Sequence, residues 1–546
     1  MLALLAATGA RPLWGAAAKD QRPATLDLRE PLRRAVACIL NRMDPAQKYR
    51  PWFAGDVVDG VPTRLCHEVW DFGDTGGRFL EALVMARQMA ASASGVLAAE
   101  PRIRRFVHSL FGSSGLIMNP ERQEMDHMFS QGSALYGLVT DFEASRDPKL
   151  EGGIKTFIGA LNRAAVQEKD YLYFPQVATK LAPCSHMAAY QVLPIVRFYE
   201  LTRHAPALEY AERLARWVID HDPTVTDDGV ITKAGWEGHL HAWMDTYTGI
   251  IRCAKAGGEL DSKAVLTRAE RLFAWVKANY ISSFGWVADS VGSQTCETDT
   301  ITSAIRLALE LIKAGHHEYW NDIERFVRNQ LVENQFVDVA RLGIRDPQTA
   351  RGLFGAFESY ANSNSLLAVK NAVVEGCCIN GGIRGLFLAY DNATHANRDE
   401  IRINLLISTG GRGVEVVSHL PFVGRLDLYP SDTRTLYVRC PDWLRPGDIQ
   451  IEGTATSVGP ERGTSYLRIR GAKAGSPLTL RFPQPFLERD YLVAGRTYHV
   501  RWKGDTVLEL TPSGTPYPIY QRQAFHREQA PMKLWDTNYQ VPRIHW

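Results

Sequence analysis

The chain has 546 residues, 45% hydrophobic and 22% charged, a balance that excludes wholesale disorder, a collagen-like fibre and a small disulfide scaffold. Its 62 Lys and Arg nearly cancel its 60 Asp and Glu, so nucleic acid is not expected as the main partner. No apolar run approaches the ~20 residues of a membrane helix, so no membrane partner is expected either.

Residues 1–25 resemble the remnant of an export signal. Leu2 to Ala7 is a short apolar run, and Ala16-Ala17-Ala18 resembles the end of a signal peptide at its cleavage site, although the charged beginning is missing. An export signal predicts a periplasmic or secreted protein. The alternative is a disordered N-terminus, which leaves a cytoplasmic location open.

Residues 26–395 follow a helical pattern. Apolar residues recur at i, i+3, i+4 and i+7 most plainly in 206–219, 262–278, 299–313 and 317–335. The other expected helices are 29–43, 74–92, 101–111, 127–145, 151–166, 186–203, 240–256, 352–370 and 380–391. About a dozen helices of similar length without a fixed-period repeat favour an (α/α)6 toroid of six hairpins over a bundle or a solenoid.

After Asn397 the pattern changes to period two, beginning with Ile401, Ile403, Leu405 and Ile407. Short strands separated by turn residues are expected at 412–418, 424–430, 434–440, 448–452, 465–471, 477–482, 497–503 and 507–511. They predict a mainly α chain with a C-terminal β-sandwich over 396–515, and sandwich domains in such architectures often support a homodimer. The tail, 516–546, is expected to be an extended strap that packs back on the helical domain.

Two of the eight cysteines, Cys377 and Cys378, are adjacent in a glycine-rich segment before a predicted helix. A disulfide between neighbours would be strained, so both are expected to be reduced. Two thiolates at a helix start can hold one soft cation, and Cys296, followed by Glu297, is a plausible third thiolate ligand. The alternatives are two small apolar residues in a tight corner and, for 293–299, ordinary helix capping.

Histidines and acids form a third group. They lie near predicted helix starts, where the inner helix ends of a toroid converge. The residues chosen as substrate-binding candidates are Asp71, His127, His186, Glu237 and His241. For each histidine, the alternative is a structural residue whose hydrogen bonds are satisfied internally.

These features together resemble a known family. Cys296, the segment 319–329, the Cys377-Cys378 pair and the strand Leu436–Trp443 are similar to glycoside hydrolase family 127, the β-L-arabinofuranosidase family, and to the related family 146. The resemblance covers most of residues 65–510. It implies an exo-acting, retaining glycosidase that releases a sugar such as L-arabinofuranose from a glycan.

The resemblance also implies a zinc site and a nucleophile. Three cysteines and a glutamate hold the zinc in that family, and the first cysteine of the pair attacks the sugar, which assigns Cys377 as nucleophile and Cys296, Cys377 and Cys378 as ligands. The family's glutamate position holds Gln294, whose neutral carbonyl is a poor zinc ligand. The fourth ligand is therefore expected to be Gln294 itself, Glu297 or Glu375, and the alternative is that zinc is lost.

The general acid/base departs from the family pattern too. The loop 284–290 is short and has no Glu, so its only carboxylate, Asp289, is the candidate, with Glu237 and Asp71 in reserve. Two other functions stay open: a carboxylate-dependent toroid hydrolase or lyase with a structural cysteine cluster, and an inactive carbohydrate-binding protein, which Gln294 and the short loop motivate.

Overall fold

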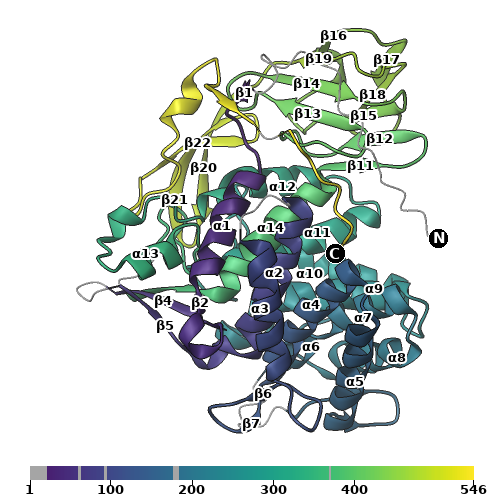
Figure 1. Cartoon of the computed structure of the whole chain (residues 1–546). Helices are drawn as coiled ribbons and strands as arrows, with labels where there is room; N and C mark the ends of the chain where they lie inside the picture. The colour runs from purple at the N-terminus through teal and green to yellow at the C-terminus, as the bar shows by residue number, and fades with distance from the viewer. Residues whose placement is uncertain (1–20, 59–62, 91–94, 176–183, 368–370, 536) are drawn as a thin grey trace, which may run out of the picture.

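The computed structural model describes residues 21–58, 63–90, 95–175, 184–367, 371–535 and 537–546 (Figure 1). Most of the signal-like segment 1–25 therefore lies outside the described residues. Within them, no helix has both the length and the apolar character that crossing a membrane requires.

Six inner helices form a closed ring. They are α2 (Gly73–Met89), α4 (Met128–Ser145), α7 (Val192–Thr202), α9 (Leu240–Lys255), α11 (Thr298–Lys313) and α14 (Gly376–Ala393). Each packs against the next, and α14 packs back against α2, which closes the ring. All of them except α7 are buried nearly all round, as helices at the centre of a large domain must be. The predicted toroid is confirmed.

An outer helix backs each inner one. The outer helices are α1 (Arg29–Asn41), α3 (Val96–Ser109), α5 (Pro148–Ala164), α8 (Ala205–Arg216), α10 (Ser262–Tyr280) and α12 (Tyr319–Phe326). Each packs one apolar face inward, and α1 completes the sixth pair by packing against α14.

The prediction of a helix over 352–370 is wrong. A short helix, α13 (Pro347–Leu353), ends there because Gly355 adopts a φ of 82°, outside the right-handed helical region. The following backbone bonds to distant segments instead, with Phe357 bridging to Gln335 and Ala361 to Cys296. The helix expected over 186–203 is divided into α6 (Ser185–Ala189) and α7.

Two sheets form a sandwich with its own apolar core, as predicted. One sheet has the order β11-β12-β15-β18-β17 and the other β13-β14-β19-β16. Their bounds are β11 (Thr394–Ala396), β12 (Glu400–Ile403), β13 (Val414–Ser418), β14 (Arg425–Pro430), β15 (Thr435–Arg439), β16 (Gln450–Glu452), β17 (Ser457–Pro460), β18 (Tyr466–Arg470) and β19 (Leu478–Arg481). Alternate residues such as Ile401, Leu426 and Leu480 point into the shared core.

The sandwich core ends at Phe482 rather than near the expected residue 515. The next strands, β20 (Phe486–Val493), β21 (Arg496–Lys503) and β22 (Thr506–Thr511), form a separate sheet. Their apolar side chains, including Val500 and Val507, belong to the core of the helical domain instead.

The tail, 516–546, packs along the helical domain. Tyr520 and Trp546 are buried in its core, and the Trp546 indole donates to Thr140 Oγ1 of α4 over 2.9 Å. Near the other end of the described chain, β1 (Gln21–Pro23) pairs with β23 (Met532–Leu534) of the tail.

A buried ionic joint connects the helical domain to the sandwich. Arg439, at the end of β15, donates to Glu324 of α12 over 2.7 Å and to Asn321 over 2.6 Å. Arg328 donates to the other oxygen of Glu324 over 2.6 Å. Burial opposes ionisation of Glu324, but Arg328 and Arg439 outweigh it and lower its pKa. Two of the segments that carried the family resemblance, 319–329 and 436–443, are thus the two halves of this joint.

Replacing Glu324 with Gln is expected to destabilise the protein by about 3–5 kcal/mol, because it leaves two buried guanidinium groups without their counter-charge. Asp432→Asn, which removes the partly exposed pair with Arg434, is the control and should cost less than about 1 kcal/mol. Chemical denaturation of both variants measures the difference. Equal effects would contradict the role given to the joint.

Candidate active site and metal centre

The first turns of five inner helices converge on one cavity. Helices α2, α4, α9, α11 and α14 all begin at this end of the ring, so the positive ends of their dipoles point at the cavity and favour anions there. The cavity has a volume of about 210 Å³. It is lined by Phe53, Trp70, Asp74, Arg78, Phe129, Trp236, His239, His241, Asp289, Ser290, Glu297, Tyr360, Glu375 and Cys377.

A small sheet positions Cys377 at the cavity. Strand β10 (Asn371–Glu375) pairs with β4 (Ala54–Val58), which pairs with β5 (Arg64–Cys66), and α14 begins directly after β10. The Gly376 N–H donates to the Phe53 carbonyl over 2.7 Å. The buried Arg42 guanidinium donates to the carbonyls of Phe53 and Val374 over 2.9 and 3.0 Å. These bonds fix the backbone immediately before the cysteine pair.

Glu297 reaches the same place from the start of α11. The backbone N–H and C=O of the preceding residue, Cys296, both bond to Ala361 in an extended bridge. Consecutive side chains of extended backbone point to opposite faces, so only one of Cys296 and Glu297 can face the cysteine pair. Glu297 does, and Cys296 lies elsewhere, with the Asn334 amide 3.8 Å from its sulfur.

This geometry departs from the expected ligand set. Cys296 does not belong to the group whose ligand atoms the structure brings together, although the Cys378 thiol is close enough to contribute to the raised pKa of Cys296. Gln294 is exposed, so it is not a ligand either. The ligand atoms of Glu297, Cys377 and Cys378 lie within 4.8 Å of one another, and all three residues are buried.

The distances in this group fit zinc. The two sulfurs are 3.9 Å apart, and Glu297 Oε1 lies 3.6 Å from Cys378 Sγ and 4.0 Å from Cys377 Sγ. A tetrahedral zinc with two sulfur ligands and one oxygen ligand requires edges of about 3.5–3.8 Å. Two thiolates and a carboxylate are also a donor set that zinc prefers. Three protein ligands beside a cavity leave the fourth position open, as in catalytic sites.

The electrostatics of the group keep its thiols protonated in the absence of a cation. The Cys378 thiol, burial and the carboxylates of Glu375 and Glu297 raise the pKa of Cys377 well above its ordinary value. Burial raises the pKa of Cys378 to about 12, and burial with the Glu297 charge raises that of Glu375 to about 7. Both thiols therefore stay protonated at neutral pH unless a metal ion binds between them.

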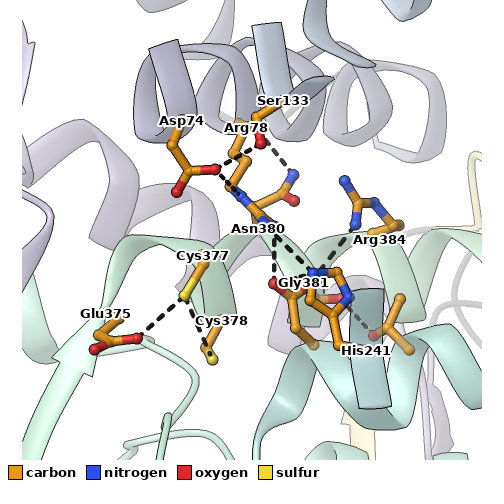
Figure 2. Close-up of polar contacts among 12 residues, drawn as sticks. Asp74, Arg78, Ser133, His241, Glu375, Cys377, Cys378, Asn380, Gly381 and Arg384 are labelled. Atoms are coloured by element: carbon orange, nitrogen blue, oxygen red, sulfur yellow. Dashed lines mark hydrogen bonds and ion pairs between the residues drawn. The ribbon is translucent and has the colours of Figure 1, made fainter. Parts of the chain in front are cut away.

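Two polar side chains of the cavity wall, His239 and Glu375, contact the group of Glu297, Cys377 and Cys378. The His239 ring lies 2.8 Å from Glu297 Oε2, and against the effect of burial this contact raises the pKa of His239 and lowers that of Glu297. Glu375 Oε2 lies 3.4 Å from Cys377 Sγ, and Tyr360 donates to its other oxygen. Figure 2 shows Cys377 between Glu375 and Cys378.

Arg78 links the cavity floor to the helices around it. Its guanidinium donates to Asp74 and to Asp299, over 2.8 Å in each case, and one nitrogen lies 3.4 Å from the His241 ring (Figure 2). Burial and the neighbouring cations keep the pKa of His241 well below its ordinary value. Deeper along the axis, Arg384 of α14 pairs with Glu81 of α2. Ion pairs thus connect inner helices across the ring.

Of the predicted catalytic and substrate-binding residues, Cys377, Asp289 and His241 line the cavity. The other candidates do not. Asp71 is fully buried and accepts from Arg50 and from the Phe53 N–H, which is a structural role. Glu237 is exposed beside Lys233.

Two predicted histidines lie just behind the cavity wall. His127 caps α4 through a bond from the Ser130 N–H and packs on Trp70. His186 is fully buried against Trp236, and neither of its ring nitrogens has a side-chain hydrogen-bond partner among the described residues. Burial keeps the pKa of His186 well below its ordinary value.

Several cavity residues were not predicted. Arg78 had a signal, since it follows Asp74 by four residues and precedes Glu81 by three in a predicted helix rich in apolar and small residues, a spacing that points to buried ion pairs. Phe53, Phe129 and Tyr360 had none, because aromatic residues are common in any core and two of these lie in irregular segments.

No protein-family model and no curated protein matches the chain. Solved structures do. A GH127 β-L-arabinofuranosidase from Geobacillus stearothermophilus T6 is 14% identical with a TM-score of 0.58, over 88% of this chain and 80% of that one. A GH127 β-arabinofuranosidase is 14% identical with a TM-score of 0.61, over 89% and 84%. A structure named only as a glycoside hydrolase is 11% identical with a TM-score of 0.60, over 89% and 81%. The likeness is one of fold.

Metal content distinguishes the observed ligand set from the expected one. We expect about one zinc per chain in the wild type and in Cys296→Ala, and loss of zinc in Cys378→Ala and Glu297→Gln, because only the last two remove ligand atoms of the group. Elemental analysis of protein purified without added metal measures this. Loss of zinc in Cys296→Ala with retention in Glu297→Gln would contradict the observed geometry.

Proposed function

We propose that this protein is a glycoside hydrolase that releases one sugar at a time from the end of a glycan, with Cys377 as nucleophile and retention of configuration. The observation that carries the proposal is the position of Cys377, whose side chain lines the cavity beside Cys378, Glu297 and a separate carboxylate, Asp289. The fold shared with known glycoside hydrolases supports it.

The size and lining of the cavity support a single sugar unit as its occupant. Its volume of about 210 Å³ is below the roughly 300–1,000 Å³ of pockets that hold larger ligands. Trp70, Phe129 and Trp236 present aromatic faces, on which the C–H faces of a sugar ring pack. L-Arabinofuranose is the sugar we propose, since two of the similar structures are arabinofuranosidases.

Two carboxylates have different tasks in this proposal. Asp289 accepts hydrogen bonds from Ser290 and Thr295, which hold it at the cavity wall. It protonates the departing glycosidic oxygen while the Cys377 sulfur attacks the anomeric carbon. It then takes a proton from the water that displaces the sulfur, so that two inversions give overall retention.

Glu297, Cys377 and Cys378 would hold the zinc. Bound zinc supplies the positive charge that keeps the thiols deprotonated at neutral pH, which the buried, acidic surroundings otherwise prevent. His239 holds Glu297 in place from the other side. The convergent helix ends add to the stabilisation of negative charge on the sulfur.

The test compares two substrates of one sugar, an aryl glycoside with a good leaving group and an alkyl glycoside with a poor one. Cys377→Ala should lower kcat on both by about 10⁴-fold or more, since it removes the attacking atom. Asp289→Asn should affect the alkyl glycoside about 10²–10⁴-fold and the aryl glycoside far less, because only the poor leaving group needs a proton. Steady-state kinetics on an arabinofuranoside pair measures both.

Cys440→Ala is the matched control, since Cys440 is a buried thiol of the sandwich core and its loss should leave kinetics unchanged. Full activity in Cys377→Ala together with inactivity of Asp289→Asn on both substrates would contradict the proposal. That result would favour a carboxylate-dependent mechanism with a structural cysteine cluster.

A further inference from the structure

A second cavity, of about 280 Å³, lies where the sheet β20–β22 meets α12 and the sandwich. It has no part in the chemistry above. It is lined by Ser283, Arg325, Asp442, Trp443, Pro485, Leu487, Arg489, Tyr491, Trp502 and Gly504. The helical domain with its β20–β22 sheet and the sandwich, which have separate cores, meet there, so the walls are fixed from both sides.

Its walls combine aromatic faces with fixed polar groups. Trp443, Tyr491 and Trp502 supply the aromatic surface. Trp502 is 4% exposed, and its indole N–H has no acceptor among the described residues, so a polar group entering the cavity can satisfy it. Arg325 is held by Asp505 over 2.8 Å and by Asp442 over 2.5 Å. The polar wall is therefore organised before any ligand arrives.

The rim of this cavity is open to solvent. Leu487 is 42% exposed, and Ser283 and Arg489 are also exposed. The charges of Arg325 and Asp442 neutralise each other, which leaves Arg489 as the one lining cation without an ion pair in the described parts of the chain. An exposed apolar and aromatic hollow in a water-facing surface marks a binding site rather than a core.

We propose that this cavity is an accessory binding site for a neutral oligosaccharide, a choice of ligand that rests on the proposed function. Aromatic rings accept the C–H faces of sugar rings, and planar guanidinium and carboxylate groups bind adjacent hydroxyl pairs. With only one uncompensated charge, the cavity favours an uncharged chain over a strongly acidic one. The glycan is bound here and not cleaved, since the nucleophile and zinc ligands lie in the other cavity.

A turn of the chain borders both cavities. Ser283 lines the second cavity, while Asp289 and Ser290 line the catalytic one. Six residues span at most about 20 Å even when fully extended, so the two Cα atoms of Ser283 and Asp289 cannot be further apart than that. A single glycan chain a few sugars long can engage both places, and the second contact would raise its effective concentration at the first.

The test measures binding without turnover, in the Cys377→Ala background. Native gels containing arabinan, arabinoxylan or galactomannan at 150 mM salt report binding as slowed migration. Ser283→Trp fills the mouth of the cavity and should weaken retardation about 5–10-fold. Ser457→Trp, an equally exposed serine on β17 of the sandwich, is the control and should leave retardation unchanged.

The same pair of substitutions is then made in the active protein. Ser283→Trp should raise KM for the retarding polysaccharide about 5–10-fold and leave kcat/KM for a small aryl glycoside unchanged, because the small substrate never reaches the second cavity. Equal kinetics of Ser283→Trp and Ser457→Trp on the polysaccharide would contradict the proposal.

Three further results would overturn it. Retardation that survives Ser283→Trp places the glycan elsewhere and leaves the proposed function intact. Turnover of aryl glycosides by a protein that no polysaccharide retards also overturns the accessory site and leaves the proposed function intact. Absence of both retardation and turnover on every glycan would overturn the accessory site and the proposed function together.

Discussion

The register between helices α11 and α14 is the constraint on which the catalytic cavity depends. Glu297 precedes α11 and the cysteine pair opens α14, so their ligand atoms meet only if the first turns of the two helices lie level. Arg78 of α2 fixes α11 by its bond to Asp299. Gly381 then lets α14 approach, because a Cβ there would lie 2.2 Å from Asp299 Oδ1. A buried ion pair and one missing side chain set the geometry of the Glu297, Cys377 and Cys378 group.

The closed ring of inner helices brings charges and helix dipoles together at the cavity. Because the inner helices begin at one end, their dipoles and their first-turn side chains gather in one small volume. That volume is acidic and buried, which keeps both thiols protonated unless a metal ion binds. In the proposed function this couples Cys377 to the metal. The sandwich takes part at a distance: Arg439 and Glu324 hold it against α12, beside the second cavity.

The sequence could predict the ring and the sandwich because their hydrophobic periods are long and regular. Of the catalytic and substrate-binding candidates that it offered, Cys377, Asp289 and His241 line the cavity, and Cys378 lies in the group beside it. It included Cys296 beside Glu297 among the metal ligands, and of these two only Glu297 belongs to the group that the structure brings together, since spacing does not tell which of two neighbours in an extended bridge faces inward. The helix expected over 352–370 failed at Gly355, and β20 escaped notice because its side chains are mostly exposed and do not alternate.

The most direct test of this account is to identify the atom that carries the sugar during turnover. The enzyme is quenched in acid while it turns over a slow arabinofuranoside, digested, and its peptides are analysed by mass spectrometry. The account predicts one added sugar on the peptide that contains Cys377, localised to that sulfur, and none in Cys377→Ala. A sugar on a carboxylate, or no covalent adduct under conditions where turnover retains configuration, would contradict it.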